Sequence, residues 1–515
     1  MIGGSGDSVD PGSPTWPITV VIAPDSFKGS LTSVEVAQAL AAGWHRARPA
    51  DAVVLSPLAD GGEGTLVAIE ASGGWSRRSA SAHDPLGRPI EAAWLLADDG
   101  HRAVVELASA SGLSRLGPGE LAAGRASTYG TGEVIRAVLD AGVRHIVLGV
   151  GGSATTDGAA GILLALGARL LDADGRDLAA AGADGRHLAA AGADGRHLAA
   201  AGADGRHLAA AGADGRSHTR PSDHGRTSAA SDHTRPAMQA DRSHTTPLSD
   251  SVDDGIAGGA SSPPDALPGV ASGAADPSTE SGSKQQMPSP RNTPPGGADL
   301  ARLATADLSD LDPRLAEVEL RIACDVTNPL LGPHGAAPTY GPQKGASPEE
   351  VATLGAALTR WADVLEQATG RHERSTPGAG AAGGTTFGLA CLAGRLRSFE
   401  IVPGVDLVMD ETGLDERLAA AGLVITGEGR IDAQTAFGKT ALGVAQRARA
   451  AGVPCIAVGG GVEPEGAAAL AALGAIAVPV IEHPMSVAEA MAAGSAPLER
   501  CGERLARLIS LDAST

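Results

Sequence analysis

The chain has 515 residues, which is enough for two or three ordinary domains and excludes a small scaffold stapled by disulfides. Its formal net charge of −20 would repel a nucleic-acid backbone or an anionic membrane surface, so an anionic substrate would need a local group of Lys and Arg. The four cysteines show no metal-binding spacing, and no apolar run approaches the ~18 residues of a membrane helix. We therefore expect a cytoplasmic protein, monomer or homodimer, with small-molecule ligands and neither a nucleic-acid nor a membrane partner.

Residues 1–17 lack the basic and apolar segments of a signal peptide, and we interpret them as a disordered lead. Strands are then predicted at residues 18–25, 51–60, 423–429, 454–461 and 475–482, and helices at 30–44 and 63–73. Thr32 and Glu35 have the spacing of a capping box at the first of these helices.

This alternation predicts an α/β fold with two α/β domains. One is a doubly wound parallel sheet, flavodoxin- or Rossmann-like, built from both chain ends at residues 18–75 and 420–515. The second, residues 76–178 and 299–419, is inserted between them.

A low-complexity segment interrupts this pattern. Four copies of "LAAAGADGRH" run from Leu178 to Ser217, the last ending in Ser217 instead of His, and the tract that follows is rich in Ser, Thr, Pro, Asp and Gly and has no aromatic residue. Such a composition buries too little apolar surface to offset chain entropy, so we interpret residues 179–298 as a disordered insertion.

Most stretches rich in Gly, Lys and acidic residues follow a predicted strand, where open α/β sheets bind ligands. Lys28 stands at a helix entrance, where backbone N–H groups and the helix dipole favour an anion. Asp60 precedes two glycines and could hold Mg²⁺ or an acceptor hydroxyl. The other candidate contacts to substrate or phosphate lie in the same kind of loop: Asp25, Ser26, Gly61, Gly62, Gly151, Gly152, Ser153, Thr155, Asn328, Lys344, Gly378 and Gly380.

Residues 149–154 match the relaxed dinucleotide pattern G-x-G-x-x-A, with Asp172 near the expected ribose position. The alternative function is therefore an NAD(P)-dependent hydroxy-acid oxidoreductase. The hydroxyl-rich, acidic end of the motif, which begins at Ser153, favours a phosphate or substrate loop instead.

The stretch "VITGEGRIDAQTAFGKT" ends as a P-loop does, but Ala433 stands where a P-loop has its first glycine. Its charged residues still favour an anion site after a buried strand. Arg430 can donate hydrogen bonds to two oxygens of an anion at once, while a nearby acidic residue binds a metal. Glu428 and Lys439 are further candidates for binding substrate or phosphate.

Seven motifs in this order closely resemble the glycerate kinase family of the bacterial type: "IAPDSFKGSLTSVEVAQAL", "PLADGGEGT", "GGSATTDGAAG", "CDVTNPLLGPHGAA", "YGPQKGA", "PGAGAAGG" and "VITGEGRIDAQTAFGKT". The resemblance covers about residues 18–178 and 299–495. It implies ATP-dependent phosphorylation of D-glycerate with Mg²⁺ in the cleft of a two-domain α/β fold, and we favour 2-phosphoglycerate over 3-phosphoglycerate as the product. The insertion departs from the family pattern.

Asp325 follows the apolar run "LRIAC" and precedes a proline-fixed turn, so it lies at a predicted strand end, where α/β sheets present reacting groups. The resemblance of this segment to "CDV-x-NPL" favours Asp325 as the base that accepts the glycerate hydroxyl proton. Lys28 and Arg430 complete the predicted catalytic set as cations. Asp60 and Asp432 are alternatives for the base, and either could instead bind the metal.

Overall fold

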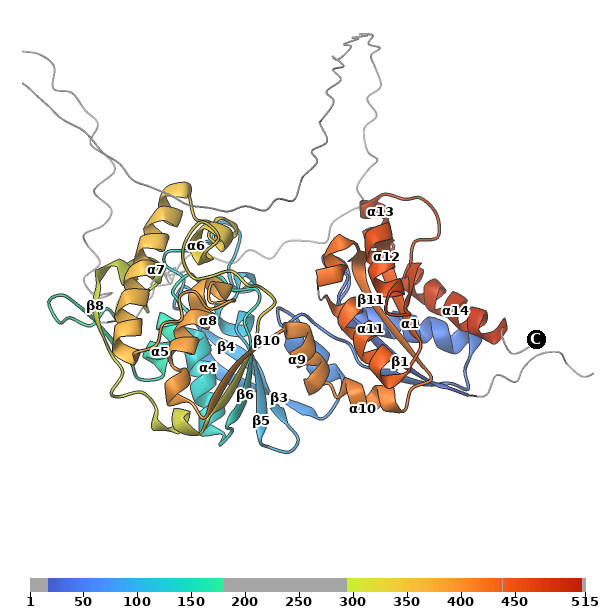
Figure 1. Cartoon of the computed structure of the whole chain (residues 1–515), viewed down its shortest axis with the longest axis horizontal. Coiled ribbons are helices and arrows are strands. Elements are labelled where there is room, and N and C mark those ends of the chain that lie inside the picture. The colour runs from blue at the N-terminus through green and yellow to red at the C-terminus, as the bar shows by residue number, and fades with distance from the viewer. Residues whose placement is uncertain (1–16, 180–293, 438, 512–515) are drawn as a thin grey trace, which may run out of the picture. The chain divides into compact units, whose positions relative to one another are not determined.

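The computed structural model describes residues 17–179, 294–437 and 439–511. One sheet has five parallel strands in the order β13-β12-β11-β1-β2, of which β1 and β11 are labelled in Figure 1. The strands are β1 Thr19–Pro24, β2 Ala52–Leu55, β11 Leu423–Ile431, β12 Cys455–Val462 and β13 Ile476–Pro479. Val20 pairs with Leu423, so the first strand lies beside a strand from the last hundred residues. The predicted parallel sheet built from both chain ends is confirmed.

Helices cover both faces of this sheet because its strands are apolar on both sides. Val20 and Ile22 pack with helices α1 and α14, whereas Val21 and Ala23 point to the opposite face and pack with α11. This is the doubly wound arrangement. The helices near this sheet are α1 Ser33–Ala47, α2 Thr65–Ala71, α9 Gly404–Glu411, α10 Leu414–Ala419, α11 Thr440–Ala451, α12 Pro464–Ala471, α13 Val487–Ala492 and α14 Ala496–Leu511.

The capping box predicted for the first helix is present in α1. The Glu35 backbone N–H donates to the Thr32 hydroxyl, and the Thr32 N–H donates to the Glu35 carboxylate. Both bonds use N–H groups that the helix itself leaves unpaired.

The second sheet has six strands in the order β10-β9-β6-β5-β4-β3. Its strands β5, β6, β9 and β10 are parallel, and β3 and β4 add an antiparallel edge. The bounds are β3 Trp75–His83, β4 Pro89–Ala97, β5 Arg102–Glu106, β6 His145–Gly149, β9 Glu319–Ala323 and β10 Ser398–Val402; β7 Arg169–Asp172 and β8 Leu303–Asp307 form a separate antiparallel ribbon. The parallel strands bring the loops after β5, β6 and β9 to one edge.

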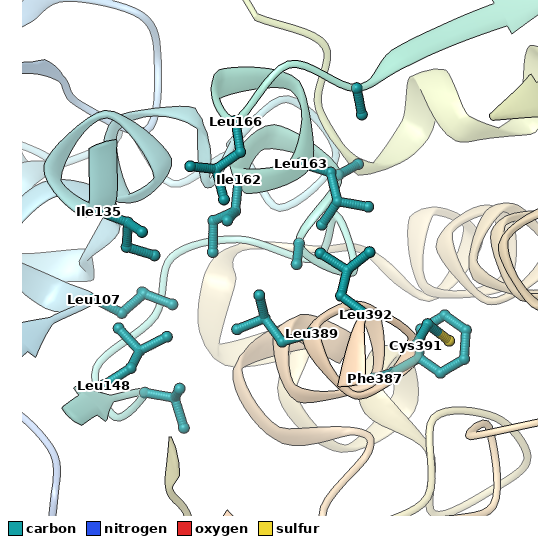
Figure 2. Close-up of a cluster of buried hydrophobic side chains, with 14 of the residues drawn as sticks. Leu107, Ile135, Leu148, Ile162, Leu163, Leu166, Phe387, Leu389, Cys391 and Leu392 are labelled. Carbon is teal, nitrogen blue, oxygen red and sulfur yellow. The ribbon is translucent and has the colours of Figure 1, made fainter. Parts of the chain in front are cut away.

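A large apolar core lies against this second sheet. Figure 2 shows Leu107 and Leu148 from the sheet side near Ile162 of α5 and Leu389 of α8. The helices of this part are α3 Ala108–Ser111, α4 Tyr129–Asp140, α5 Ala160–Ala165, α6 Ala336–Tyr340, α7 Pro348–Thr369 and α8 Ala381–Cys391. No helix in the described ranges combines the length and apolarity needed to cross a membrane.

The predicted domain boundaries remain a prediction, and residues 180–293 of the predicted insertion lie outside the described residues. The chain is described again from residue 294, where Pro295, Gly296 and Gly297 are buried. A Cβ on Gly297 would lie 2.2 Å from the backbone oxygen of Thr156. These last residues of the predicted insertion therefore pack against the folded chain.

Candidate active site

The loops that follow β2, β6 and β9 line one pocket of about 200 Å³. Residues 340–344 and the start of α8 complete its wall. Eight of the residues predicted from sequence line it: Asp60, Gly61, Gly62, Gly151, Gly152, Ser153, Asp325 and Lys344. Sequence reasoning missed Cys324, Tyr340, Gln343, Ala381 and Ala382, which also line it. All five lie inside the quoted motifs, and Tyr340 and Gln343 closely precede the predicted Lys344 in the chain.

Two glycine-rich loops meet at the pocket in backbone contact. The Gly151 N–H donates to the Gly61 backbone oxygen at 3.4 Å. A Cβ on Gly151 would lie only 2.4 Å from the Gly62 Cα, so a side chain at this position would force the loops apart. A glycine is therefore required at position 151 for the two loops to approach this closely.

Asp325 follows β9 and lines the pocket, where it is exposed to solvent although protein atoms surround much of its carboxyl group. Its Oδ1 accepts a hydrogen bond from the Gly404 N–H at 2.7 Å. Burial raises the pKa of Asp325 to about 6; the Gly404 N–H opposes this, and the negative charges of Asp60, Asp406 and Asp25 add to it. The carboxylate is therefore ionised at neutral pH and can take up a proton close to that pH.

Asp60 joins the loop after β2 to the loop after β1. Its Oδ2 accepts a hydrogen bond from the Lys28 Nζ at 3.0 Å, and its Oδ1 accepts one from the Gly62 N–H at 3.3 Å. The nearby charge of Asp60 raises the pKa of Lys28, so the ammonium group stays protonated. Lys28 does not line the pocket itself, but it contacts a residue that does.

Asp25 fastens the end of β1 to the start of α11. Its Oδ2 accepts a hydrogen bond from the Thr440 hydroxyl at 2.7 Å, and its Oδ1 accepts one from the Ser26 N–H at 2.6 Å. Burial and the charge of Asp60 raise the pKa of Asp25. In the segment that ends like a P-loop, the Thr440 hydroxyl therefore donates to the Asp25 carboxylate at the end of β1. Gly438 of the same segment lies outside the described residues.

The charged residues of β11 and its following turn lie beyond the pocket lining. The Glu428 Oε1 accepts from the Thr435 hydroxyl at 2.7 Å, and burial raises the Glu428 pKa, while the hydrogen bond from Thr435 and the charge of Lys439 lower it. Arg430 is largely exposed and forms an ion pair with Glu463. Its Nε lies 3.7 Å from the nearer oxygen of Asp432.

Lys344 is the most deeply buried charged side chain of the pocket, at 2% exposure. Its Nζ donates to the backbone oxygen of Thr155 at 2.5 Å. Burial lowers the pKa of Lys344 to about 7, and the carboxylate of Asp157 acts in the opposite direction. Asp157, fully buried beside the Ser153–Thr155 hydroxyl pair, was not selected as a site residue from sequence.

Asn328, Gly378 and Gly380 support the pocket wall from behind. The Asn328 backbone oxygen accepts from the Gly380 N–H at 2.9 Å, and its side-chain Oδ1 accepts from the Tyr340 hydroxyl at 2.8 Å. A Cβ on Gly378 would lie 3.1 Å from the Cys324 Sγ. These predicted residues therefore hold residues that line the pocket.

The dinucleotide alternative does not fit the geometry around residues 149–154. A dinucleotide loop leads directly into a helix whose N-terminus meets the pyrophosphate, whereas α5 begins only at Ala160. Asp172 ends β7, which belongs to the separate antiparallel ribbon and not to a parallel neighbour of β6. The oxidoreductase is therefore not supported.

The described residues contain no group of three or more His, Cys, Asp or Glu side chains that could hold a metal. Magnesium needs fewer protein ligands, because it commonly keeps several waters and takes one or two carboxylates plus substrate phosphates. Asp60 in the pocket fits this pattern, and its negative charge lies close enough to Asp325 to raise the pKa of that carboxyl group. Asp432 lies near Glu428 and does not line the pocket.

A two-sheet α/β fold with glycine-rich loops, an ionisable carboxylate and a buried lysine around one small pocket is typical of enzymes that act on small anionic molecules. The model of the glycerate kinase family matches residues 20–205 and 282–510. The chain belongs to the glycerate kinase family and is therefore an enzyme, a kinase that acts on glycerate, as the motifs predicted.

Individual relatives agree with the family match. The chain is 33% identical to a glycerate kinase of Halalkalibacterium halodurans over 96% of this chain and 100% of the relative. It is 32% identical to the glycerate 2-kinase of Escherichia coli over 86% of this chain and 84% of the relative. The chain is also similar to a crystal structure from Salmonella typhimurium LT2 that is assigned as a glycerate kinase 2, with 30% sequence identity and a TM-score of 0.66. The match covers 97% of this chain and 100% of that chain.

Proposed function

We propose that the enzyme transfers the γ-phosphoryl group of ATP to D-glycerate and forms 2-phosphoglycerate. The observation that carries this proposal is the pocket itself, in which the Asp325 carboxylate stands with two backbone-contacting glycine loops and the buried Lys344. A general base works best when its pKa lies near the operating pH, and the Asp325 pKa of about 6 meets this condition.

Asp325 acts as the base in this mechanism. Its carboxylate takes the proton of the glycerate hydroxyl while the hydroxyl oxygen forms a bond to the γ-phosphorus and the bond from that phosphorus to the ADP oxygen breaks. The Gly404 N–H fixes the orientation of Asp325, because it holds Oδ1 at 2.7 Å. The proton ends on Asp325, and the phosphoryl group ends on the glycerate oxygen.

Cations and backbone dipoles neutralise the transferred group, which is the main task of the protein in phosphoryl transfer. Lys344 and the N–H groups of the two glycine loops are the nearest candidates in the pocket wall. Lys28 supplies further positive charge through Asp60. Arg430 and Lys439 lie outside the pocket lining, and we assign them a role in attracting the anionic substrates to this edge of the sheet.

Asp60 is the residue that we expect to hold Mg²⁺, with Asp432 as a more distant carboxylate. A bound Mg²⁺ would neutralise phosphate charge and orient the nucleotide. When no metal is bound, the Lys28 ammonium group balances the Asp60 charge at 3.0 Å.

The choice of the 2-hydroxyl follows the relative from Escherichia coli, which is named a glycerate 2-kinase and is 32% identical to this chain. The test is to incubate the protein with ATP, Mg²⁺ and D-glycerate and to measure ADP with and without glycerate. Glycerate-dependent ADP release is expected, and its absence would contradict the proposal. Enolase added without a mutase should consume the product directly; a product that needs the mutase is 3-phosphoglycerate.

A further inference from the structure

Glu106 is a buried carboxylate that the mechanism above does not use. It is the last residue of β5, and it is 6% exposed. Its Oε1 accepts a hydrogen bond from the Gly64 N–H at 3.0 Å, and its Oε2 accepts one from the Leu66 N–H at 3.3 Å. Each oxygen of one side chain therefore holds a different backbone donor of a loop that begins more than forty residues earlier in the chain.

These donors belong to the start of α2, which has no cap of its own. The residue before α2 is Gly64, which has no side chain to accept a hydrogen bond and adopts a φ of 96°. The first N–H groups of a helix have no partner inside the helix, and a negative charge there is favourable. Glu106 supplies from the second sheet the cap that the local sequence cannot supply.

The segment that Glu106 holds is part of the pocket wall. Residues 60–64 carry Asp60, Gly61 and Gly62, which all line the pocket. The segment also touches the next loop, because the Gly61 backbone oxygen accepts from the Gly151 N–H. A shift of this segment would therefore move the Asp60 carboxylate and loosen the contact between the two glycine loops.

We propose that Glu106 is a positioning residue for the phosphoryl-transfer pocket, because its hydrogen bonds to the Gly64 and Leu66 N–H groups clamp residues 60–66 against the second sheet. This inference rests on the proposed assignment of the pocket as the place where glycerate and ATP react. Glu106 itself does not line the pocket and has no direct contact with the reacting groups.

The charges around Glu106 allow it to ionise near neutral pH. Burial raises its pKa to about 7, the Leu66 and Gly64 N–H groups act in the opposite direction, and the negative charge of Glu63 and the positive charge of Arg77 add smaller opposing effects. Arg77 is itself paired with Glu70 on α2. Above pH 7 both carboxylate oxygens of Glu106 accept hydrogen bonds from the Gly64 and Leu66 N–H groups. When Glu106 is protonated, one oxygen carries an O–H donor that faces an N–H donor, so one of the two hydrogen bonds is lost.

The test is Glu106→Gln, which keeps the volume but turns an NH₂ group toward one of the two N–H donors. Loss of a hydrogen bond to a charged group should raise KM about tenfold, with a smaller change in kcat. The matched control is Glu411→Gln. Glu411 is equally buried and is held by Arg102, the first residue of β5, at 2.8 Å, so it lies at the strand end away from the pocket. We expect this control to lower thermal stability and leave KM within about twofold.

Each outcome decides the inference. Normal KM and kcat in a folded Glu106→Gln protein would overturn it, and so would an equal rise of KM in Glu411→Gln, which would indicate a general loss of rigidity. If Glu106→Gln does not fold, Glu106→Asp keeps the charge, shortens the reach by one methylene and should show the same KM rise in smaller measure. Asp325→Asn separates the two proposals: unchanged kcat there means that Asp325 is not the base and leaves the clamp untouched, whereas lost kcat together with normal KM and kcat in Glu106→Gln removes the clamp alone.

Discussion

Asp325 illustrates how one residue acquires reactivity from its surroundings. Partial desolvation in the pocket wall and nearby negative charges raise the pKa of Asp325 to about 6, against the opposing effect of the hydrogen bond from the Gly404 N–H. An aspartate in water would be a weaker base by roughly two pKa units. Burial therefore suits this side chain to proton transfer near neutral pH.

The first prediction concerns Asp325→Asn. The amide keeps the shape and can still accept the Gly404 N–H, but it cannot take the hydroxyl proton. We expect kcat to fall by roughly 10²–10⁴ while the thermal transition stays in place. Steady-state kinetics and a thermal melt measure both quantities. Near-normal kcat in the folded variant would assign Asp325 to the turn and move the search for the base to Asp60 or Asp432.

The second prediction is the pH dependence of kcat/KM. Because Asp325 acts as the carboxylate, activity should fall about tenfold per pH unit below pH 6. The raised pKa means that the folded protein binds this proton more tightly than the unfolded chain, so the stability due to this group increases as the pH falls from 6 toward 4. The activity loss should thus precede any unfolding due to this group. A kcat/KM that stays flat down to pH 5 would contradict the assignment.

At the scale of elements, the pocket depends on loops that touch through their backbones. The loops after β2 and β6 can approach this closely only because Gly151 lacks a side chain. The start of α8 contributes a second unusual backbone, since Ala382, Gly383 and Gly384 in succession adopt positive φ values of 51°, 69° and 90°. Such conformations persist only where the surroundings enforce them, and they are concentrated at functional sites.

The third prediction is that Gly151→Ala impairs catalysis through loop separation. The added Cβ would lie 2.4 Å from the Gly62 Cα, so one loop must move. We expect kcat/KM to fall at least about tenfold and the free energy of unfolding to fall by about 1–3 kcal/mol. Gly355→Ala in α7 is the matched control, because its Cβ would meet nothing within 4 Å. That change should leave kinetics unchanged and raise stability by about 0.5–1 kcal/mol. Equal kinetic effects of the two substitutions would exclude the loop contact as the cause.

At the scale of the whole molecule, the long segment between β7 and β8 contains none of the residues that we assign to the site. The described chain resumes at residue 294 and packs at once, with Gly296 and Gly297 buried against backbone atoms of Arg125 and Thr156. Long insertions between fixed ends add little to the closure entropy. The catalytic pocket should therefore not depend on residues 180–293.

The fourth prediction concerns the segment between residue 179 and residue 294, where the described chain resumes. A chain in which a short Gly/Ser linker replaces residues 180–293 should keep kcat and KM within a few fold of the full chain. A chain that runs from Leu178 straight to Asp299 also lacks Gly296 and Gly297, and it should melt at a lower temperature because their packing is lost. Kinetics and thermal melts of the three proteins measure the difference. Loss of activity in the linker version would give the replaced segment a part in folding or catalysis.

The sequence alone determined the family and several elements of the first sheet, although the strand predicted at 51–60 covers only Ala52–Leu55. Apolar runs such as 18–25 and 423–429 have the length and composition of buried strands, and a capping box such as Thr32 with Glu35 depends only on residues three apart, so both could be predicted from local pattern. Seven motifs in a fixed order sufficed for the family, because motif order does not require knowledge of distances.

Only the tertiary structure decided which of the predicted residues share a pocket. The sequence predicted both Arg430 and Asp325 as catalytic residues. In the structure, however, Arg430 is exposed and forms an ion pair with Glu463, whereas Asp325 lines the pocket. Glu106 carries no local signal, because its partners Gly64 and Leu66 are remote in sequence, and the acidic end of the motif at Asp157 did not reveal that Lys344 lies near it. Burial and long-range contacts set their protonation and their roles, and both arise only when strands from distant parts of the chain pair.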